Sequence, residues 1–206
     1  MCIRDRLNKG NKKLNLSVLK GPCLAGELAR KTKSSVVIAN KNTKIAKSIG
    51  KLISTNYYKI EYSKDVRGVE ICSAIKNIYS MLIGAGGGSN TSSSIFTESI
   101  NEMVYLTKFL KGKEETVYGL AGVGDLYVSA VGGRNSKMGE FLGRGFTFKN
   151  AKKKFMLNDT IEGAELAFEI GKQILKKVNN KKIPLMVDLI KSILNNKKLN
   201  IRWQIK

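Results

Sequence analysis

Hydrophobic positions in the first part of the chain alternate between strand-like runs and helix-like spacing. Runs rich in β-branched and aromatic residues predict strands at 14–19, 34–41 and 57–63. Between them, Pro22 suits the first turn of one helix, and the spacing of isoleucine and leucine in 43–54 favours a second, amphipathic helix. The order strand, helix, strand, helix, strand is typical of an α/β domain.

From Val66 onward the helical period replaces the strand pattern, and no convincing strand is expected. Asp65 is a suitable N-cap for the first helix, and Ser89 or Asn90 for the second. The expected helices are 66–85, 91–111, 119–131, 136–144, 163–178 and 184–194. The pattern therefore predicts an α/β portion followed by an all-α domain.

The first of these helices carries a lysine on one of its hydrophobic faces. Two adjacent apolar stripes run along it, Ile71, Ile75, Ile78 and Leu82 in one and Val69, Cys72 and Ile83 in the other. Lys76 falls on the second stripe. Helix geometry alone favours a lysine that extends its ammonium group outward to solvent. A chemical role for Lys76 needs support from other parts of the sequence.

The 206 residues carry a formal net charge of +21, which raises the possibility of nucleic-acid binding. The basic residues are mostly lysine and are spread along the whole chain, without an RNP-type, C2H2 or RGG motif. We therefore interpret the charge as a solvated surface and expect no nucleic-acid partner. A basic helical nucleic-acid-binding protein stays as a less favoured alternative.

The chain has no histidine, which excludes nucleophile relays and zinc sites that depend on this side chain. Its cysteines, Cys2, Cys23 and Cys72, lie far apart, and no apolar run approaches the length of a membrane span. We therefore expect reduced thiols, a cytoplasmic location, no membrane span and no metal site. The first six residues, MCIRDR, differ from the rest in composition and are expected to be a non-native leader.

Four sequence blocks carry a resemblance to a known family. They are LKGPCLAGELA (19–29), DVRGVEICSAIKNIYSMLIGAGGGSN (65–90), GLAGVGDLYVSAVGGRNSKMGEFLGRG (119–145) and TIEGAELA (160–167). In this order and spacing the blocks resemble the NAD(P)-dependent glycerol-3-phosphate dehydrogenases, over about 14–195. The glycines at 84–88 follow a helix rather than a strand, so they do not form a dinucleotide-binding fingerprint.

The resemblance implies a Rossmann-type dinucleotide-binding domain followed by a helical substrate domain like that of 6-phosphogluconate dehydrogenase. Residues 7–64 would be the end of the first domain, and residues 65–206 the second. The phosphate-binding glycine loop would lie upstream of Met1, so the chain is expected to be a C-terminal fragment with little activity of its own. In the full-length form a homodimer is expected.

The activity that the resemblance implies is reversible hydride transfer between NAD(P)H and dihydroxyacetone phosphate. The product, sn-glycerol 3-phosphate, feeds glycerophospholipid synthesis. The implied cofactor is NAD or NADP, and the implied partner is a small phosphorylated substrate. The alternative enzyme is another NAD(P)-dependent dehydrogenase with a helical C-domain, acting on a hydroxy acid or sugar acid.

The resemblance gives Lys76 the position of the family's catalytic lysine. Reduction of a ketone builds negative charge on the carbonyl oxygen, and an ammonium group aimed there stabilises that charge and exchanges a proton. Asn77 and Asp125 would contact the substrate, and the Asp125 carboxylate would also hold the ammonium. An ordinary N-cap after Gly124 is the structural alternative for Asp125.

Gly133, Arg134 and Asn135 are expected at or just before a helix N-terminus. Backbone N–H groups there favour an anion, and the planar guanidinium of an arginine suits phosphate. The three residues would bind the substrate, and Arg134 would contact the cofactor as well. A solvated surface arginine is the structural alternative.

The remaining expected contacts come from the first and last blocks. Gly21 and Cys23 would lie near the substrate, and Ala25, Thr160 and Glu162 near the cofactor. Cys23 stands where the family usually has serine or threonine, and the change removes a good hydroxyl donor. An acid at a helix N-terminus is the structural alternative for Glu162.

Overall fold

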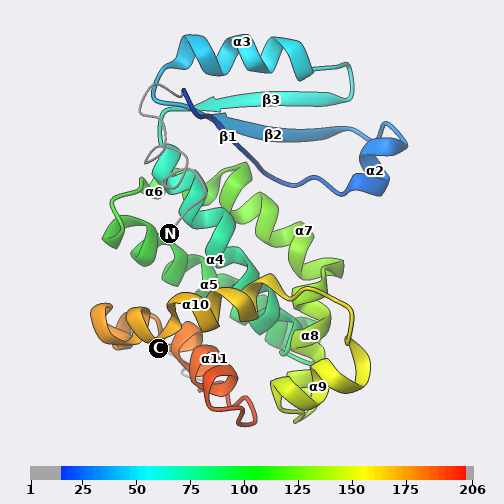
Figure 1. Ribbon diagram of the computed structural model, residues 1–206, viewed down its shortest axis with the longest axis vertical. Coiled ribbons are helices and arrows are strands. Elements are labelled where there is room, and N and C mark those ends of the chain that lie inside the picture. The colour runs from blue at the N-terminus through cyan, green and yellow to red at the C-terminus, as the bar shows by residue number, and fades with distance from the viewer. Residues whose placement is uncertain (1–14, 203–206) are drawn as a thin grey trace.

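A computed structural model describes residues 15–202. A small sheet with a helix on its outer face lies against a larger helical body (Figure 1). The three strands are β1 (Val18–Lys20), β2 (Ser34–Ala39) and β3 (Tyr58–Ser63), in that spatial order. Strand β2 pairs antiparallel with β1 and parallel with β3. The expected leader at 1–6 lies outside the described residues.

The predicted order of strands and helices in this part is confirmed, with two shifts at the element ends. Strand β1 is shorter than the expected 14–19, and the helix expected from Pro22 begins only at α2 (Ala25–Ala29). Gly21 lies between them with a φ of +131°, a conformation that ends the strand and suits glycine. Helix α3 (Thr43–Ile53) begins where expected and covers the sheet.

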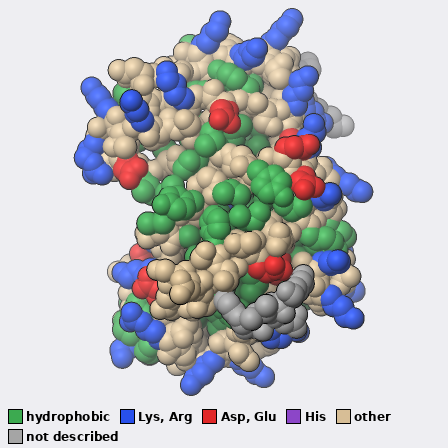
Figure 2. Space-filling model, turned by 180° about the vertical axis from the view of Figure 1, so that it is seen from behind, with side chains coloured by type: hydrophobic (Ala, Val, Ile, Leu, Met, Phe, Trp, Pro, Cys, Tyr) green, Lys and Arg blue, Asp and Glu red, His purple; other side chains and the backbone are tan. Residues whose placement is uncertain are grey.

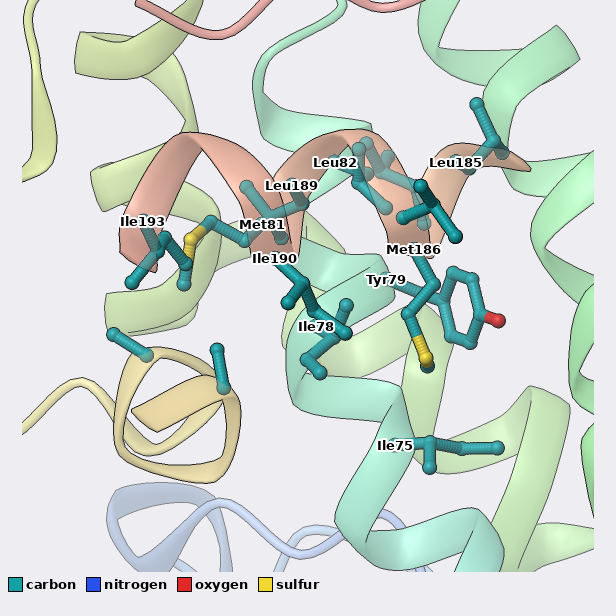
Figure 3. Close-up of a cluster of buried hydrophobic side chains, with 14 of the residues drawn as sticks. Ile75, Ile78, Tyr79, Met81, Leu82, Leu185, Met186, Leu189, Ile190 and Ile193 are labelled. Carbon is teal, nitrogen blue, oxygen red and sulfur yellow. The ribbon is translucent and has the colours of Figure 1, made fainter. Parts of the chain in front are cut away.

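Helix α4 (Val66–Gly84) is the centre of the helical body. The helices that pack around it include α5 (Ser89–Phe109), α7 (Asp125–Gly132), α8 (Arg134–Gly143), α10 (Glu162–Lys177) and α11 (Pro184–Leu194). Figure 3 shows side chains of α4 and α11 interleaved, with the Tyr79 ring beside Met186. This packing explains why α4 is apolar around most of its circumference.

Some helices begin as predicted and others do not. Asp65 caps α4 as predicted, because its carboxylate accepts the Gly68 N–H at 3.0 Å. The prediction of Ser89 or Asn90 as the next cap is wrong, since Gly88 holds that position in α5. Helix α8 begins at Arg134, slightly earlier than expected. As expected, the described residues beyond 64 contain no strand.

Two short helices and two irregular turns escaped the sequence pattern. The helices are α6 (Glu114–Tyr118) and α9 (Phe148–Phe155), and the latter buries only Phe148 and Ala151 within a lysine-rich segment. The helix expected at 119–131 is a π-helical turn, Leu120–Gly124, that leads into α7. A short 3₁₀ turn, Asn180–Lys182, precedes α11.

The sheet and the helical body share a small hydrophobic contact. Val37 and Ala39 of β2 pack with Val66 and Val69 of α4 and with Ala121 of the π-helical turn. Within 15–202, no helix has the length and hydrophobicity that crossing a membrane requires. Lys and Arg side chains are scattered around both ends of the face shown in Figure 2, and hydrophobic side chains gather across its middle.

Candidate active site

The lysine of α4 is paired inside the molecule. The Lys76 ammonium donates hydrogen bonds to the Asp125 carboxylate and, at 2.9 Å, to the Ser129 hydroxyl. Only 14% of the Lys76 side chain and 10% of the Asp125 side chain are exposed. The helix-geometry interpretation, an ammonium extended into solvent, is therefore wrong. We call these three residues the lysine cluster.

The buried carboxylate is the electrostatic centre of this cluster. Burial raises the pKa of the Asp125 carboxyl above its usual range, because water no longer stabilises the charged form. The positive charge of Lys76 lowers this pKa in part, and that of Lys20, at the end of β1, adds a smaller lowering effect. The cluster thus keeps a cation and an anion together where solvent screens them little.

The connection after β1 lies over the turn that precedes the cluster. A Cβ atom built at Gly21 would be 3.5 Å from Leu120 Cβ, and one built at Gly124 would be 3.7 Å from the Pro22 ring. The expectation that Gly21 lies close to the site region is consistent with these contacts. The connection after β1 therefore lies next to the turn that leads into Asp125.

The π-helical turn before α7 determines the direction of the Asp125 side chain. Gly124 already has helical dihedral angles, φ −61° and ψ −48°, so α7 continues from the turn without a capping residue. The N-cap interpretation of Asp125 is therefore wrong, and its side chain points to α4 instead. Ser129 follows one helical turn later on the same face. Sequence reasoning missed Ser129, although its i+4 spacing from Asp125 was a usable signal.

A second cluster lies at the start of α8. Gly133 is the N-cap of this helix and supplies no side-chain hydrogen bond, so the backbone N–H groups of the first turn lack a side-chain acceptor from the cap. Arg134 forms an ion pair with Glu162, the first residue of α10. Asn135 donates to the Glu162 carboxylate at 3.0 Å and to the Asn77 side-chain oxygen at 3.3 Å. We call Asn77, Arg134, Asn135 and Glu162 the arginine cluster.

Gly163 allows the arginine cluster to close against α4. The Asn135 side-chain oxygen accepts the Gly163 N–H at 2.9 Å. A Cβ at Gly163 would lie 2.6 Å from the Asn77 carbonyl oxygen, too close for any other residue without movement. Lys76 and Asn77 are consecutive residues of α4, and the Gly133 N–H at the start of α8 donates to the Ser129 carbonyl at 3.2 Å, so the two clusters lie close to one another.

Three further predicted site residues lie at the surface. Cys23, Ala25 and Thr160 are exposed. Burial and then the neighbouring Cys23 thiol raise the pKa of Tyr58, so Cys23 lies beside the start of β3. Among the residues that the structure describes, no group of three His, Cys, Asp or Glu side chains could hold a metal ion.

The two clusters differ in what they can do chemically. The lysine cluster holds a mostly buried ammonium group that can stabilise a developing negative charge and exchange a proton. The arginine cluster offers a guanidinium group beside a helix N-terminus, a donor set that suits phosphate or pyrophosphate. Together they fit a ligand that has a reacting oxygen close to a phosphate group.

A family model for the C-terminus of NAD-dependent glycerol-3-phosphate dehydrogenase matches residues 65–202. The chain is 34% identical over 168 residues to the NADP(+)-dependent glycerol-3-phosphate dehydrogenase of Archaeoglobus fulgidus. The matched region covers 75% of this chain and 50% of the relative. It is 31% identical over 181 residues to glycerol-3-phosphate dehydrogenase [NAD(P)+] of Clostridium botulinum, covering 84% of this chain and 53% of the relative. The chain thus spans about half the length of these curated relatives.

The fold is similar to that of the crystal structure of glycerol-3-phosphate dehydrogenase from Coxiella burnetii. The TM-score is 0.85 at 26% sequence identity, and the match covers 95% of this chain and 61% of that one. The likeness confirms the predicted fold class, the end of a Rossmann-type α/β domain followed by a helical domain.

Proposed function

Since this chain belongs to the NAD-dependent glycerol-3-phosphate dehydrogenase family, we propose that its protein interconverts dihydroxyacetone phosphate and sn-glycerol 3-phosphate with NAD or NADP as cofactor. The observation that supports this best is the mostly buried Lys76–Asp125 pair beside a phosphate-suited arginine cluster. Residues 65–206 would bind the substrate, and residues 7–64 would belong to the cofactor domain. The product would enter glycerophospholipid synthesis.

In this proposal Lys76 is the catalytic residue. The nicotinamide cofactor supplies the hydride when it is bound. The Lys76 ammonium stabilises the negative charge that develops on the carbonyl oxygen and then gives that oxygen a proton. Asp125 and Ser129 hold the ammonium in place from α7. Their shared burial strengthens the electrostatic effect, because little water screens it.

The arginine cluster would hold the phosphate group. Arg134 offers a planar set of donors, and the α8 N-terminus adds backbone N–H groups. Asn77 and Asn135 would fix the polar end of the substrate. Contacts of Gly21 and Cys23 with the substrate, and of Ala25, Thr160 and Glu162 with the cofactor, stay predictions.

The test is the Lys76→Ala variant of the protein expressed from its whole gene. NADH oxidation with dihydroxyacetone phosphate should fall by about a thousandfold or more in a variant that circular dichroism shows to be folded. Lys137→Ala removes an exposed lysine of α8 and is the matched control. A turnover rate near that of the unmodified protein would reject the assignment.

A substrate panel separates this proposal from the alternative dehydrogenase. The protein should reduce dihydroxyacetone phosphate and leave unphosphorylated dihydroxyacetone untouched, because the arginine cluster needs an anion to bind. Oxidation of hydroxy acids or sugar acids in preference to sn-glycerol 3-phosphate would favour the alternative.

We further propose a homodimer, located in the cytoplasm, that does not bind nucleic acid. The free thiols of Cys23 and Cys72 are consistent with a reducing compartment. The scattered lysines of Figure 2 are consistent with a solvated surface. Sedimentation of the whole protein, and a titration with duplex DNA and single-stranded RNA at varied salt, would test the two points about partners.

A further inference from the structure

The Arg134–Glu162 pair lies where the proposed function needs an available guanidinium group. The Glu162 carboxylate accepts from a terminal nitrogen of Arg134 and, through its other oxygen, from the Asn135 amide at 3.0 Å. One acid therefore engages both of the α8 residues that would bind a phosphate group.

We propose that Glu162 is a positioning residue that competes with a phosphate group for Arg134 and weakens phosphate binding through its negative charge. A phosphate group must share or take over the guanidinium, and only a strongly anionic group does so. This inference rests on the proposed function and names a specificity device within the same site.

The exposure of the pair makes such an exchange feasible. The Arg134 and Glu162 side chains are 54% and 37% exposed, so water already screens their attraction. Exposed ion pairs of this kind contribute little net stability, and a dianionic phosphate can displace the carboxylate from the guanidinium.

The carboxylate cannot move far away after the exchange. Asn135 holds it at 3.0 Å, and Asn135 is itself buried and fixed by the Gly163 N–H at 2.9 Å. The negative charge of Glu162 thus remains beside the phosphate site in both states, where it repels the bound anion. Removal of this charge should strengthen phosphate binding, provided that the arginine stays in place.

The phosphate group could belong to the substrate or to the pyrophosphate of the cofactor. The chemistry of recognition is the same in both cases, and the two sources differ in which ligand responds. The experiment therefore uses sn-glycerol 3-phosphate and NAD⁺ as separate probes.

The test is isothermal titration of the protein expressed from its whole gene, and of its variants, with each probe. In Glu162→Gln, the dissociation constant of at least one probe should fall about two- to fivefold, the size expected for a partly exposed charge. The Nε–H resonance of Arg134 should shift on titration with that probe. Glu165→Gln removes an exposed acid one turn further along α10 and should leave both dissociation constants unchanged.

Glu162→Asp separates the charge from the contact. The shorter side chain keeps the negative charge but reaches Arg134 less well, so binding should stay close to that of the unmodified chain. If Glu162→Asp binds as tightly as Glu162→Gln, the contact rather than the charge is responsible, and the charge inference is wrong.

The outcomes distinguish this inference from the proposed function. Unchanged or weaker binding of both probes in Glu162→Gln, with binding that Arg134→Ala abolishes, overturns the inference and leaves the phosphate site intact. Absence of Arg134-dependent binding in the unmodified chain and in Glu162→Gln rejects the phosphate site, and the inference with it. Tighter binding of one probe supports the inference and identifies the source of the phosphate group.

Discussion

Two acidic residues are buried within 15–202, and their side chains bind different kinds of partner. Asp125 is 7% exposed and holds the Lys76 ammonium, with Ser129 beside it. Glu102 is 1% exposed, and burial raises the pKa of its carboxyl to about 7. The difference lies in the partners, since Asp125 holds a charged group that can react and Glu102 contacts only neutral donors.

Glu102 is a capping residue supplied by a distant helix. Its carboxylate accepts the N–H groups of Leu185 and Met186, at 2.7 and 3.1 Å, and the Tyr79 hydroxyl at 3.0 Å. These N–H groups belong to the first turn of α11, whose own N-cap, Ile183, supplies no side-chain hydrogen bond. Figure 3 shows Tyr79 beside Met186 at this junction. The comparison teaches that a buried acid with a raised pKa is not by itself evidence of an active site.

The largest expected effect is the loss of turnover in Asp125→Asn. The amide keeps the size of the side chain but no longer holds the ammonium by charge, so kcat should fall about a thousandfold. The measurement is NADH oxidation by the whole protein, together with its melting temperature. Glu102→Gln is the control, and its kcat is expected to equal that of the unmodified protein. Equal losses of kcat in both variants would break the comparison.

The next effect is on stability and belongs to Glu102→Ala. The change leaves two backbone N–H groups and a phenol without their acceptor in a buried place, at a cost of about 4 kcal/mol. Chemical denaturation of the chain measures this free energy. Asn101→Ala, at the exposed neighbouring position of α5, should cost less than about 0.5 kcal/mol. A similar cost for both variants would contradict the capping role.

The sequence predicted Lys76 and its helix but only part of their surroundings. The apolar stripes and the Asp65 cap located α4, because both are local patterns. The pairing of Lys76 with Asp125 joins residues 49 positions apart, and only the family resemblance suggested it. Glu102 and Leu185 are 83 positions apart, and no local pattern indicates that contact.

The same distinction between local and distant signals explains the other differences. Ser129 was missed because its i+4 spacing from Asp125 becomes informative only once the Asp125 side chain is known to face α4. Helix α9 was missed because its lysines hide the few buried positions. Resemblance alone grouped Cys23, Ala25 and Thr160 with the site; all three are exposed, and their contacts with substrate and cofactor stay predictions.

A further effect is the pH dependence of stability. Glu102 has a folded-state pKa of about 7, raised from 4.5, mainly because burial disfavours the charged form. Below pH 4.5 the Glu102 carboxyl is protonated in both the folded and the unfolded protein. As the pH rises above 4.5, the carboxyl of the unfolded protein loses its proton first. The stabilising effect is therefore lost as pH rises from about 4.5 to about 7, a decrease of about 3 kcal/mol.

Denaturation of the unmodified chain and Glu102→Gln at several pH values measures this dependence. The variant should lose most of the decrease, since glutamine does not titrate. Asp125, whose pKa is also raised by burial, gives a decrease of the same sign that should persist in the variant. A rise of stability with pH across this window in the unmodified chain would contradict the assignment.

The smallest effects come from removing the hydroxyl group beside Lys76 or the one beside Glu102. Ser129→Ala deletes an acceptor 2.9 Å from the Lys76 ammonium, and Tyr79→Phe deletes a donor 3.0 Å from the Glu102 carboxylate. Each hydrogen bond to a charged group is worth about 1.5 kcal/mol. In Ser129→Ala this loss should appear as an approximately tenfold lower kcat with unchanged stability.

In Tyr79→Phe the same loss should appear as reduced stability with unchanged kcat. The contrast follows because Lys76 would act on the substrate, whereas Glu102 acts only on the start of α11. Ser129→Thr keeps the hydroxyl and should retain most of the turnover, which separates the loss of the acceptor from any change in helix packing. If Ser129→Ala lowers stability and leaves kcat unchanged, the lysine cluster is a structural device like the one at Glu102, and the comparison no longer separates chemistry from capping.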